Sequence, residues 1–272
     1  MDPSNNNSHE PVIVFEDVSI AFDEKKVLTN LSFTLLHGQT KVLFGVAGAG
    51  KTLVLKLALG LMRPDSGRIV VLGQEVSAMK EHDLFALRKR IGMVFQESAL
   101  FDSLNVEDNV SFRLREERTP MDEITQRVED ALRFVELEHT MKLFPSELSG
   151  GMRRRVAIAR AIITEPELLL YDSPTAGLDP VTSTTIVELL VKQRDVNRTS
   201  ALLVTHRLQD AFTMATHVFD SKQNKMVPVA PGTDWDSNTS FLVLKDGVKI
   251  FEGSAAEIAN SDSEYIREYL TQ

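Results

Sequence analysis

Residues 45–52 read Gly45-Val46-Ala47-Gly48-Ala49-Gly50-Lys51-Thr52. This sequence fits the phosphate-binding loop pattern, in which a glycine and four further residues precede Gly-Lys-Ser/Thr. The apolar run at 40–44 predicts a strand before the loop, and the run at 53–59 predicts a helix after it. The alternative interpretation, a glycine-rich turn before an ordinary helix, leaves the Lys-Thr pair at this spacing unexplained. The segment therefore predicts a site for a nucleoside triphosphate.

Each part of this loop has a physical role in holding phosphate. Glycines let backbone amides close around an anion, because side chains would block the approach. The following helix directs the positive end of its dipole at the same place, so we expect the contacts to extend to Leu53. Lys51 is expected to reach the β- and γ-phosphates, and the Thr52 hydroxyl to ligate Mg²⁺. A nucleotide bound with Mg²⁺ is the predicted ligand.

The composition is that of an ordinary globular chain. Its 272 residues suit one large domain, or one core with an inserted subdomain. Hydrophobic residues make up 43% of the chain and charged residues 25%, as in soluble globular proteins. The net charge of −9 argues against nucleic acid as the main partner. Because there is no cysteine, disulfides and thiolate metal sites are excluded.

No segment predicts insertion into a membrane. No apolar run approaches the ~20 residues that span a bilayer. Residues 1–11 are polar, lack the apolar core of a signal peptide and are expected to be disordered. We therefore expect a cytoplasmic protein that reaches a membrane only through a partner.

The remaining pattern alternates strands with helices. Strands are predicted at 12–20, 31–36, 68–72, 91–95, 168–171 and 201–205. Helices are predicted at 83–90, 106–115, 121–135, 151–163, 182–193 and 208–215. This alternation implies an α/β fold with a mainly parallel sheet and helices on both faces. The helical block between 95 and 168 is predicted to be an insertion, and 224–240 a loop or extended hairpin.

Two further segments extend the phosphate-binding pattern. The apolar run at 168–171 ends in Asp172, and in phosphate-loop proteins such an aspartate helps to hold Mg²⁺ opposite the loop threonine. Residues 148–152 read Leu148-Ser149-Gly150-Gly151-Met152 and precede a basic helical run. A serine hydroxyl and bare amides at the start of a helix form a second anion site.

This second segment resembles the signature motif of ABC (ATP-binding cassette) ATPases, which usually ends in Gln where Met152 stands. The resemblance implies that Ser149, Gly151 and Met152 contact the γ-phosphate of ATP held by a partner chain. It spans residues 14 to about 253 and implies a P-loop NTPase fold with a RecA-like core and a mainly parallel sheet. A β-rich N-terminal subdomain and a helical subdomain inserted at about 97–164 are also implied.

The same resemblance implies how the chain is divided and assembled. Residues 12–253 would form the ABC ATPase domain, and 254–272 a C-terminal helical extension. Two chains would form a head-to-tail homodimer around two molecules of ATP with Mg²⁺.

Further positions match the family. Gln96, after the strand at 91–95, resembles the Q-loop glutamine, which contacts Mg²⁺ or water. Residues 176–179 resemble the D-loop, which places Asp179 across the dimer interface. His206 resembles the switch histidine, which contacts the γ-phosphate. Phe22 lies where the family places an aromatic ring that stacks on adenine, an interaction worth about 0.5–1.5 kcal/mol. Phe22 equally suits a position in the hydrophobic core.

The chain departs from the family at Ser173. The family places a glutamate after the strand-ending aspartate, and this glutamate polarises the attacking water. A serine hydroxyl is not a base at neutral pH without activation, and loss of a general base typically costs about 10²–10⁴ in rate. We therefore expect ATP binding and dimerisation with slow or differently assisted hydrolysis. His206, or Asp179 of the partner subunit, would then orient water.

Three local features resemble one branch of the family, the ATPases of Mla/Mce-type systems that move phospholipids between membranes of a Gram-negative envelope. These are Met152, the Pro-Ser-Glu at 145–147 and the segment at 96–110. In that branch the segment after the Q-loop receives a coupling helix from an integral-membrane permease. Apolar residues here suit such docking, or a hydrophobic staple under the next helix: Ala99, Leu100, Phe101 and Leu104.

The branch implies further partners and a location. A lipid-binding periplasmic protein and a small accessory subunit are expected, with the chain held at the inner membrane by the permease. Two other functions stay open: a nucleotide-gated interaction module that controls a membrane assembly, which Ser173 favours, and the ATPase of a nutrient importer. The arginines at 153–155 are interpreted as a solvated helix face with some contact to phosphate or the dimer interface.

Overall fold

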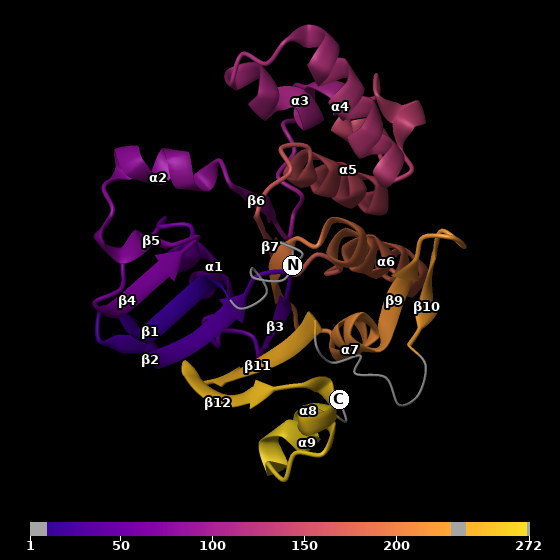
Figure 1. Ribbon diagram of the computed structural model, residues 1–272. Coiled ribbons are helices and arrows are strands. Elements are labelled where there is room, and N and C mark those ends of the chain that lie inside the picture. Colours follow the sequence, from indigo (N-terminus) through magenta and orange to yellow (C-terminus); the bar gives the residue numbers. More distant parts are fainter. Residues whose placement is uncertain (1–9, 230–237, 271–272) are drawn as a thin grey trace, which may run out of the picture.

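The computed structural model describes residues 10–229 and 238–270. A six-stranded sheet in the order β12-β11-β3-β8-β7-β6 forms its centre (Figure 1). Its strands are β3 (Thr40–Phe44), β6 (Ile91–Val94), β7 (Leu168–Asp172), β8 (Ser200–Val204), β11 (Thr239–Lys245) and β12 (Val248–Gly253). Every neighbouring pair is parallel except β11 with β12. The carboxyl ends of β3, β7 and β8 therefore meet at one edge, where ligands bind in open α/β sheets.

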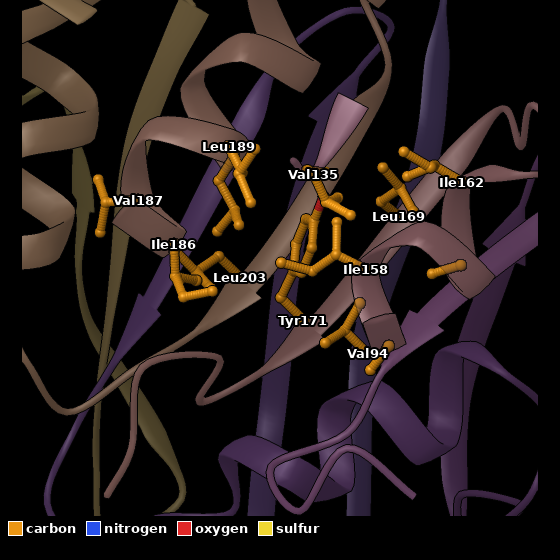
Figure 2. Packing of buried hydrophobic residues seen from close by; sticks show 14 of the residues in the cluster. Val94, Val135, Ile158, Ile162, Leu169, Tyr171, Ile186, Val187, Leu189 and Leu203 are labelled. Atoms are coloured by element: carbon orange, nitrogen blue, oxygen red, sulfur yellow. The ribbon is translucent and has the colours of Figure 1, made fainter. Parts of the chain in front are cut away.

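The two faces of this sheet bury different cores. Side chains alternate along each strand, so Phe44 enters one core while Leu43 enters the other. Figure 2 shows Tyr171 and Leu203 of the first core with the helix residue Ile186. The helices that contribute to this core include α5 (Gly150–Ile162), α6 (Pro180–Asn197) and α7 (Leu208–Thr216). Full burial of a side chain such as that of Phe44 stabilises the fold by about 1.5–3 kcal/mol.

The second core lies between the central sheet and an antiparallel sheet in the order β2-β1-β4-β5. The strands are β1 (Pro11–Phe22), β2 (Lys25–Leu36), β4 (Ser66–Val71) and β5 (Gln74–Glu75). Helix α1 (Lys51–Ala58) contributes its buried side chains to this core, and α2 (Glu81–Arg88) follows β5. One face of the central sheet is thus covered by helices, and the other by α1 together with a second sheet.

The helices α3 (Val106–Glu116), α4 (Met121–Phe134) and α5 form a helical lobe at one end of the molecule (Figure 1). Asn105 caps α3, because its side chain accepts a hydrogen bond from the backbone N–H of Asp108 at 2.8 Å. The helical character predicted between 106 and 163 is confirmed. The helices α8 (Ala255–Ala259) and α9 (Glu264–Leu270) lie at the opposite end.

The structure differs from the prediction mainly at the ends of the chain. Pro11 is the first residue of β1 rather than part of a disordered segment, and residues 1–9 lie outside the described residues. The sequence did not predict β9 (His217–Asp220), β11 or β12. In the predicted loop at 224–240, β10 (Lys225–Pro228) pairs with β9, residues 239–240 begin β11, and 230–237 lie outside the described residues. Phe95 follows β6 and is exposed.

None of the described helices has the length and apolarity needed to cross a bilayer.

Candidate nucleotide-binding site

The phosphate loop between β3 and α1 depends on its glycines. Gly45, Gly48 and Gly50 have φ angles of 151°, 83° and 92°, a region that other L-residues rarely adopt. A Cβ on Gly45 would lie 2.5 Å from the carbonyl oxygen of Leu244, whereas a Cβ on Gly48 would meet no atom within 4 Å. Gly45 is therefore fixed by packing against β11, and Gly48 faces open space, where its backbone can approach a ligand.

The N-terminus of α1 points its amides at this loop. No side chain caps the helix, and its first turn contains no acidic residue, so the amides there are suited to an anion. The Lys51 ammonium donates hydrogen bonds to the carbonyl oxygens of Gly45 at 2.6 Å and Val46 at 2.8 Å. Burial lowers the pKa of Lys51, while the Asp172 carboxylate acts in the opposite direction. The lysine thus lies over the loop, partly removed from water.

The ends of β7 and β8 bring the other predicted groups to the loop. Asp172 and Ser173 are 7% and 6% exposed. Ser173 has a φ of 47°, so the chain turns sharply after β7. A cavity of about 530 Å³ lies between these strand ends and α1. Its lining residues are Ala47, Gly48, Gly50, Lys51, Thr52, Leu53, Gln96, Ser173, Val204 and His206.

The donor atoms at this cavity suit a nucleotide with Mg²⁺. Thr52 and Gln96 line it, and Asp172 directly precedes Ser173, which also lines it. Their hydroxyl, amide and carboxylate oxygens are the ligand types that Mg²⁺ takes. Within residues 10–229 and 238–270, no three or more His, Asp or Glu side chains gather to hold a metal by themselves. A Mg²⁺ ion here would take water or phosphate oxygens as further ligands.

A second cavity, of about 780 Å³, adjoins the first and shares Ala47 and Gly48 with it. Phe22 lines this cavity and is 43% exposed, so the alternative of a core position is wrong. An exposed aromatic ring beside a phosphate loop suits a nucleobase. Asp246 and Gly247 also line the cavity. Sequence reasoning missed them because they form the turn between β11 and β12, which it did not predict.

The signature segment lies outside both cavities of its own chain. Ser149 is the N-cap of α5, and its Oγ accepts a hydrogen bond from the Met152 N–H at 3.2 Å. None of Ser149, Gly151 and Met152 lines either cavity. A Cβ on Gly151 would lie 2.3 Å from Cγ2 of Thr182. The signature turn therefore packs tightly against the start of α6.

Asp179, the predicted D-loop residue, caps α6 and is exposed. Its Oδ1 accepts a hydrogen bond from the Thr182 N–H at 3.0 Å, and its Oδ2 accepts one from the Thr182 hydroxyl at 2.5 Å. Both hydrogen bonds lower the pKa of Asp179, and the one from the Thr182 hydroxyl has the larger effect. Thr182 thus joins the D-loop to the signature turn within one chain.

Arg207, which follows His206, was missed by sequence reasoning. Its guanidinium donates to the Ser183 hydroxyl at 2.6 Å and lies 3.4 Å from the Asp210 carboxylate. The same carboxylate accepts a hydrogen bond from the Thr175 hydroxyl. This network ties the loop after β8 to the loop after β7. Nothing in the sequence indicates these partners, because they come together only in the folded chain.

The arginines near the start of α5 also differ from the prediction. Arg154 is only 4% exposed and donates to the carbonyl oxygens of Phe95, at 2.8 Å, and Gln96. Arg155 donates to the carbonyl oxygen of Val135 at 3.1 Å. The interpretation as a solvated face is wrong for Arg154, because its guanidinium is buried against the backbone of the Gln96 segment.

A third cavity, of about 360 Å³, opens beside the segment that follows Gln96. Its lining is mainly apolar and includes Leu61, Ile91, Met93, Phe95, Ala99, Phe101 and Phe112. Ala99 and Phe101 are exposed as predicted, whereas Leu100 packs against the first core and Leu104 is half-buried. Part of this segment therefore serves as a hydrophobic support for the fold.

Asn109 on α3 holds the wall of this third cavity. Its side chain is completely buried. Its Oδ1 accepts a hydrogen bond from the Phe101 N–H at 2.8 Å. Its Nδ2 donates to the carbonyl oxygens of Phe101, Leu104 and Asn105 at 3.0, 2.9 and 3.0 Å. One amide thus fixes the backbone of the segment from 101 to 105.

A family model described as "ABC transporter" matches residues 28–176 of the 272-residue chain. The chain belongs to the ABC transporter family. With the fold and the cavities above, this membership confirms the predicted ABC ATPase resemblance and the P-loop NTPase fold. Membership of this family also supports the prediction that the chain binds ATP and is an ATPase.

Two proteins similar to this ABC chain have names that refer to lipids. The chain is 36% identical over 217 residues to the "Intermembrane phospholipid transport system ATP-binding protein MlaF" of Escherichia coli K12, covering 79% of this chain and 81% of that protein. It is 35% identical over 276 residues to "Protein TRIGALACTOSYLDIACYLGLYCEROL 3, chloroplastic" of Arabidopsis thaliana, covering 97% and 75%. The predicted resemblance to the phospholipid-transport branch is confirmed.

A relative from another branch and two solved structures complete the comparison. The ABC chain is 35% identical over 228 residues to the "Methionine import ATP-binding protein MetN" of Mesorhizobium japonicum, covering 83% and 62%. The structure of cbiO1 from Clostridium perfringens, part of the transporter complex cbiONQ, superposes with a TM-score of 0.78 at 26% identity, covering 97% and 96%. The dimeric cassette MJ0796 with ADP and Pi superposes with a TM-score of 0.74 at 25% identity, covering 89% and 98%.

Proposed function

We propose that this ABC ATPase drives the transport of phospholipids between the membranes of an envelope. The main support for ATPase activity is the cavity of about 530 Å³ that the phosphate loop lines together with Gln96, Ser173 and His206. These groups come from four separate segments, and a nucleoside triphosphate site needs phosphate-binding, metal-holding and water-orienting groups at one place. The lipid substrate is supported by the similarity to MlaF, which is named for intermembrane phospholipid transport.

In the proposed site, each group has one task. Backbone amides from 45 to 53 and the Lys51 ammonium hold the phosphates, and Phe22 stacks on the base. Thr52, Gln96 and Asp172 hold Mg²⁺, which when bound neutralises charge on the β- and γ-phosphates. His206 contacts the γ-phosphate from the end of β8.

Hydrolysis in this chain is proposed to be slow. Ser173 stands where the family has its glutamate, and it offers a hydroxyl rather than a carboxylate to the attacking water. Positioning and charge stabilisation by Lys51 and the loop remain, and these carry much of phosphoryl transfer. Water is oriented by His206 or by Asp179 of the partner subunit.

The working form is proposed to be a homodimer with shared sites. Ser149 is exposed and lies outside its own nucleotide cavity, although a helix N-terminus with a serine cap suits phosphate. A second chain, placed head to tail, would bring its Ser149, Gly151 and Met152 to the γ-phosphate. Asp179 is exposed at the start of α6, where the same dimer would bury it.

The third cavity is proposed to receive the permease. It is open and mainly apolar, with exposed aromatic rings at Phe101 and Phe112, and such a surface suits an apolar helix of a partner. The chain would then lie at the cytoplasmic side of the inner membrane. A lipid-binding periplasmic protein and a small accessory subunit complete the proposed assembly.

The test is reconstitution of the full chain with its permease in liposomes that contain a fluorescent phospholipid. ATP-dependent transfer of the lipid to acceptor vesicles, lost in Lys51→Ala, supports the proposal. Methionine uptake without lipid transfer would favour a nutrient importer, the alternative raised by MetN. ATP-dependent assembly without transport of either compound would favour a nucleotide-gated interaction module, the alternative raised by Ser173.

A further inference from the structure

The backbone from Phe95 to Ala99 is held by two arginines of α5. Arg154 donates a hydrogen bond from Nη1 to the Phe95 carbonyl oxygen at 2.8 Å and another from Nη2 to the Gln96 carbonyl oxygen. Arg160 donates to the carbonyl oxygens of Ser98 and Ala99 at 2.8 and 2.7 Å. Each guanidinium thus spans two successive carbonyls, with Glu97 between the two pairs.

The segment needs such support because its own conformation is unfavourable. Ser98 and Ala99 have φ angles of 64° and 48°, and non-glycine L-residues rarely adopt this left-handed region. Its internal hydrogen bonds run from the Ser98 N–H to the Phe95 carbonyl at 3.0 Å and from the Ala99 N–H to the Glu97 carbonyl at 2.7 Å. The Phe95 carbonyl therefore accepts from Ser98 and from Arg154 together.

Arg154 makes these contacts as a buried cation. Its side chain is 4% exposed, and burial lowers its pKa, while the Glu97 and Asp172 carboxylates act in the opposite direction. Removing a guanidinium from water is costly unless its donors are bonded; the two terminal nitrogens of Arg154 are bonded to carbonyls, whereas its Nε is buried without a hydrogen-bond partner among the described residues. The planar guanidinium fork of Arg154 fits two successive carbonyls. A lysine ammonium on its flexible side chain would not hold both in one geometry.

We propose that Arg154 is a positioning residue for Gln96. By binding the carbonyls on both sides of the Gln96 N–Cα bond, it fixes the backbone from which the Gln96 side chain enters the nucleotide cavity. Arg160 holds the far end of the segment, beside the third cavity that it also lines. The inference rests on the proposed role of Gln96 as a Mg²⁺ ligand. It adds that Arg154 holds the backbone of this ligand in position. A metal ligand without its supporting group is typically weakened by about 10–100-fold in metal affinity or activity.

The first test is hydrogen exchange in the nucleotide-free full chain. Arg154→Met, which keeps the length of the side chain and removes the fork, is expected to speed exchange of the amides at 96–99. Arg155→Met is the matched control, since Arg155 lies on the same helix but donates to Val135. Unchanged exchange at 96–99 in Arg154→Met, or an equal increase in Arg155→Met, would overturn the proposal. If Arg154→Met does not fold, Arg154→Lys carries the same comparison, because an ammonium keeps the charge but not the fork.

The second test is a double-mutant cycle with Mg²⁺ titrated into the ATPase reaction. Arg154→Met is expected to raise the half-saturating Mg²⁺ concentration about 10–100-fold, with ATP affinity in EDTA unchanged. Because Arg154 acts through Gln96, the double variant should match Gln96→Ala alone, whereas additive losses would contradict the proposal. If Gln96→Ala itself has no effect, the proposed role of Gln96 fails. If Gln96→Ala is impaired and Arg154→Met is normal, only the positioning role fails.

Discussion

The hydroxyl oxygen of Ser173 lies 3.4 Å from Oδ1 of Asp172, at the end of β7. Both side chains are buried, and Ser173 lines the nucleotide cavity. The hydroxyl is a weak donor to the carboxylate that is proposed to hold Mg²⁺, and it supplies no negative charge of its own. The position at which we expect the general base of the family thus carries a neutral group in this chain.

Restoring the carboxylate should speed hydrolysis. Ser173→Glu in the permease complex is expected to raise turnover by about 10²–10⁴, the usual contribution of a general base. The measurement is phosphate release at saturating ATP and Mg²⁺. Ser173→Gln is the matched control, because it has the same size and must adopt the same left-handed backbone without supplying a base. An equal rate in the two variants would contradict the proposed consequence of Ser173.

The signature turn should tolerate a methyl group at one glycine and not at the next. A Cβ on Gly151 would lie 2.3 Å from Cγ2 of Thr182, whereas the nearest atom to a Cβ on Gly150 is Cδ2 of Leu178 at 3.6 Å. Overpacking of this kind costs about 1–3 kcal/mol, and the gain in helix propensity applies to both variants. We expect Gly151→Ala to be less stable than Gly150→Ala by about that amount in urea unfolding. Equal midpoints would show that Thr182 moves away without cost.

As pH is raised, ATP binding should begin to weaken at a lower pH than it would if Lys51 had the ordinary pKa of a lysine. The pKa of Lys51 is lowered from 10.5, chiefly by burial, so the folded chain loses this charge below pH 10.5. The sign is opposite for stability: burial disfavours the charged form, so this cost to the folded state disappears, and stability rises, as pH increases from the lowered pKa of Lys51 towards 10.5. ATP affinity measured in EDTA from pH 7 to 10.5 checks the direction. Lys51→Arg, whose charge persists above pH 12, should show no such decline.

The wall of the third cavity should depend on a neutral amide. Asn109→Asp removes three donated hydrogen bonds and places a carboxylate against the carbonyls of Phe101, Leu104 and Asn105. Leaving buried groups unsatisfied costs about 1–3 kcal/mol, more with a charge. Asn105→Asp is the control, because aspartate caps a helix as well as asparagine does. Urea unfolding at pH 7 should separate the two variants, and equal loss in both would contradict the role assigned to Asn109.

The sequence predicted which loop and strand-end residues gather at one cavity better than it predicted the residues that support them. The phosphate loop, Asp172 and His206 follow apolar strands, and parallel strands bring their carboxyl ends together, so the grouping at one edge was foreseeable. The partners of Arg154, Arg207 and Asn109 were not, because a polar residue on a helix carries no sign of which backbone it meets. The strands β11 and β12 were missed because they follow a polar loop and no helix pattern separates them.

The contact between Gly45 and Leu244 also has a consequence for how the protein is made. A Cβ on Gly45 would lie 2.5 Å from the Leu244 carbonyl, so the base of the phosphate loop rests on a strand encoded far downstream. At about 5–20 residues per second, the ribosome needs on the order of 10–40 s to travel from one to the other. We expect the nascent chain to have no competent nucleotide site during that interval. A ribosome-bound chain that captures ATP has therefore already synthesised β11.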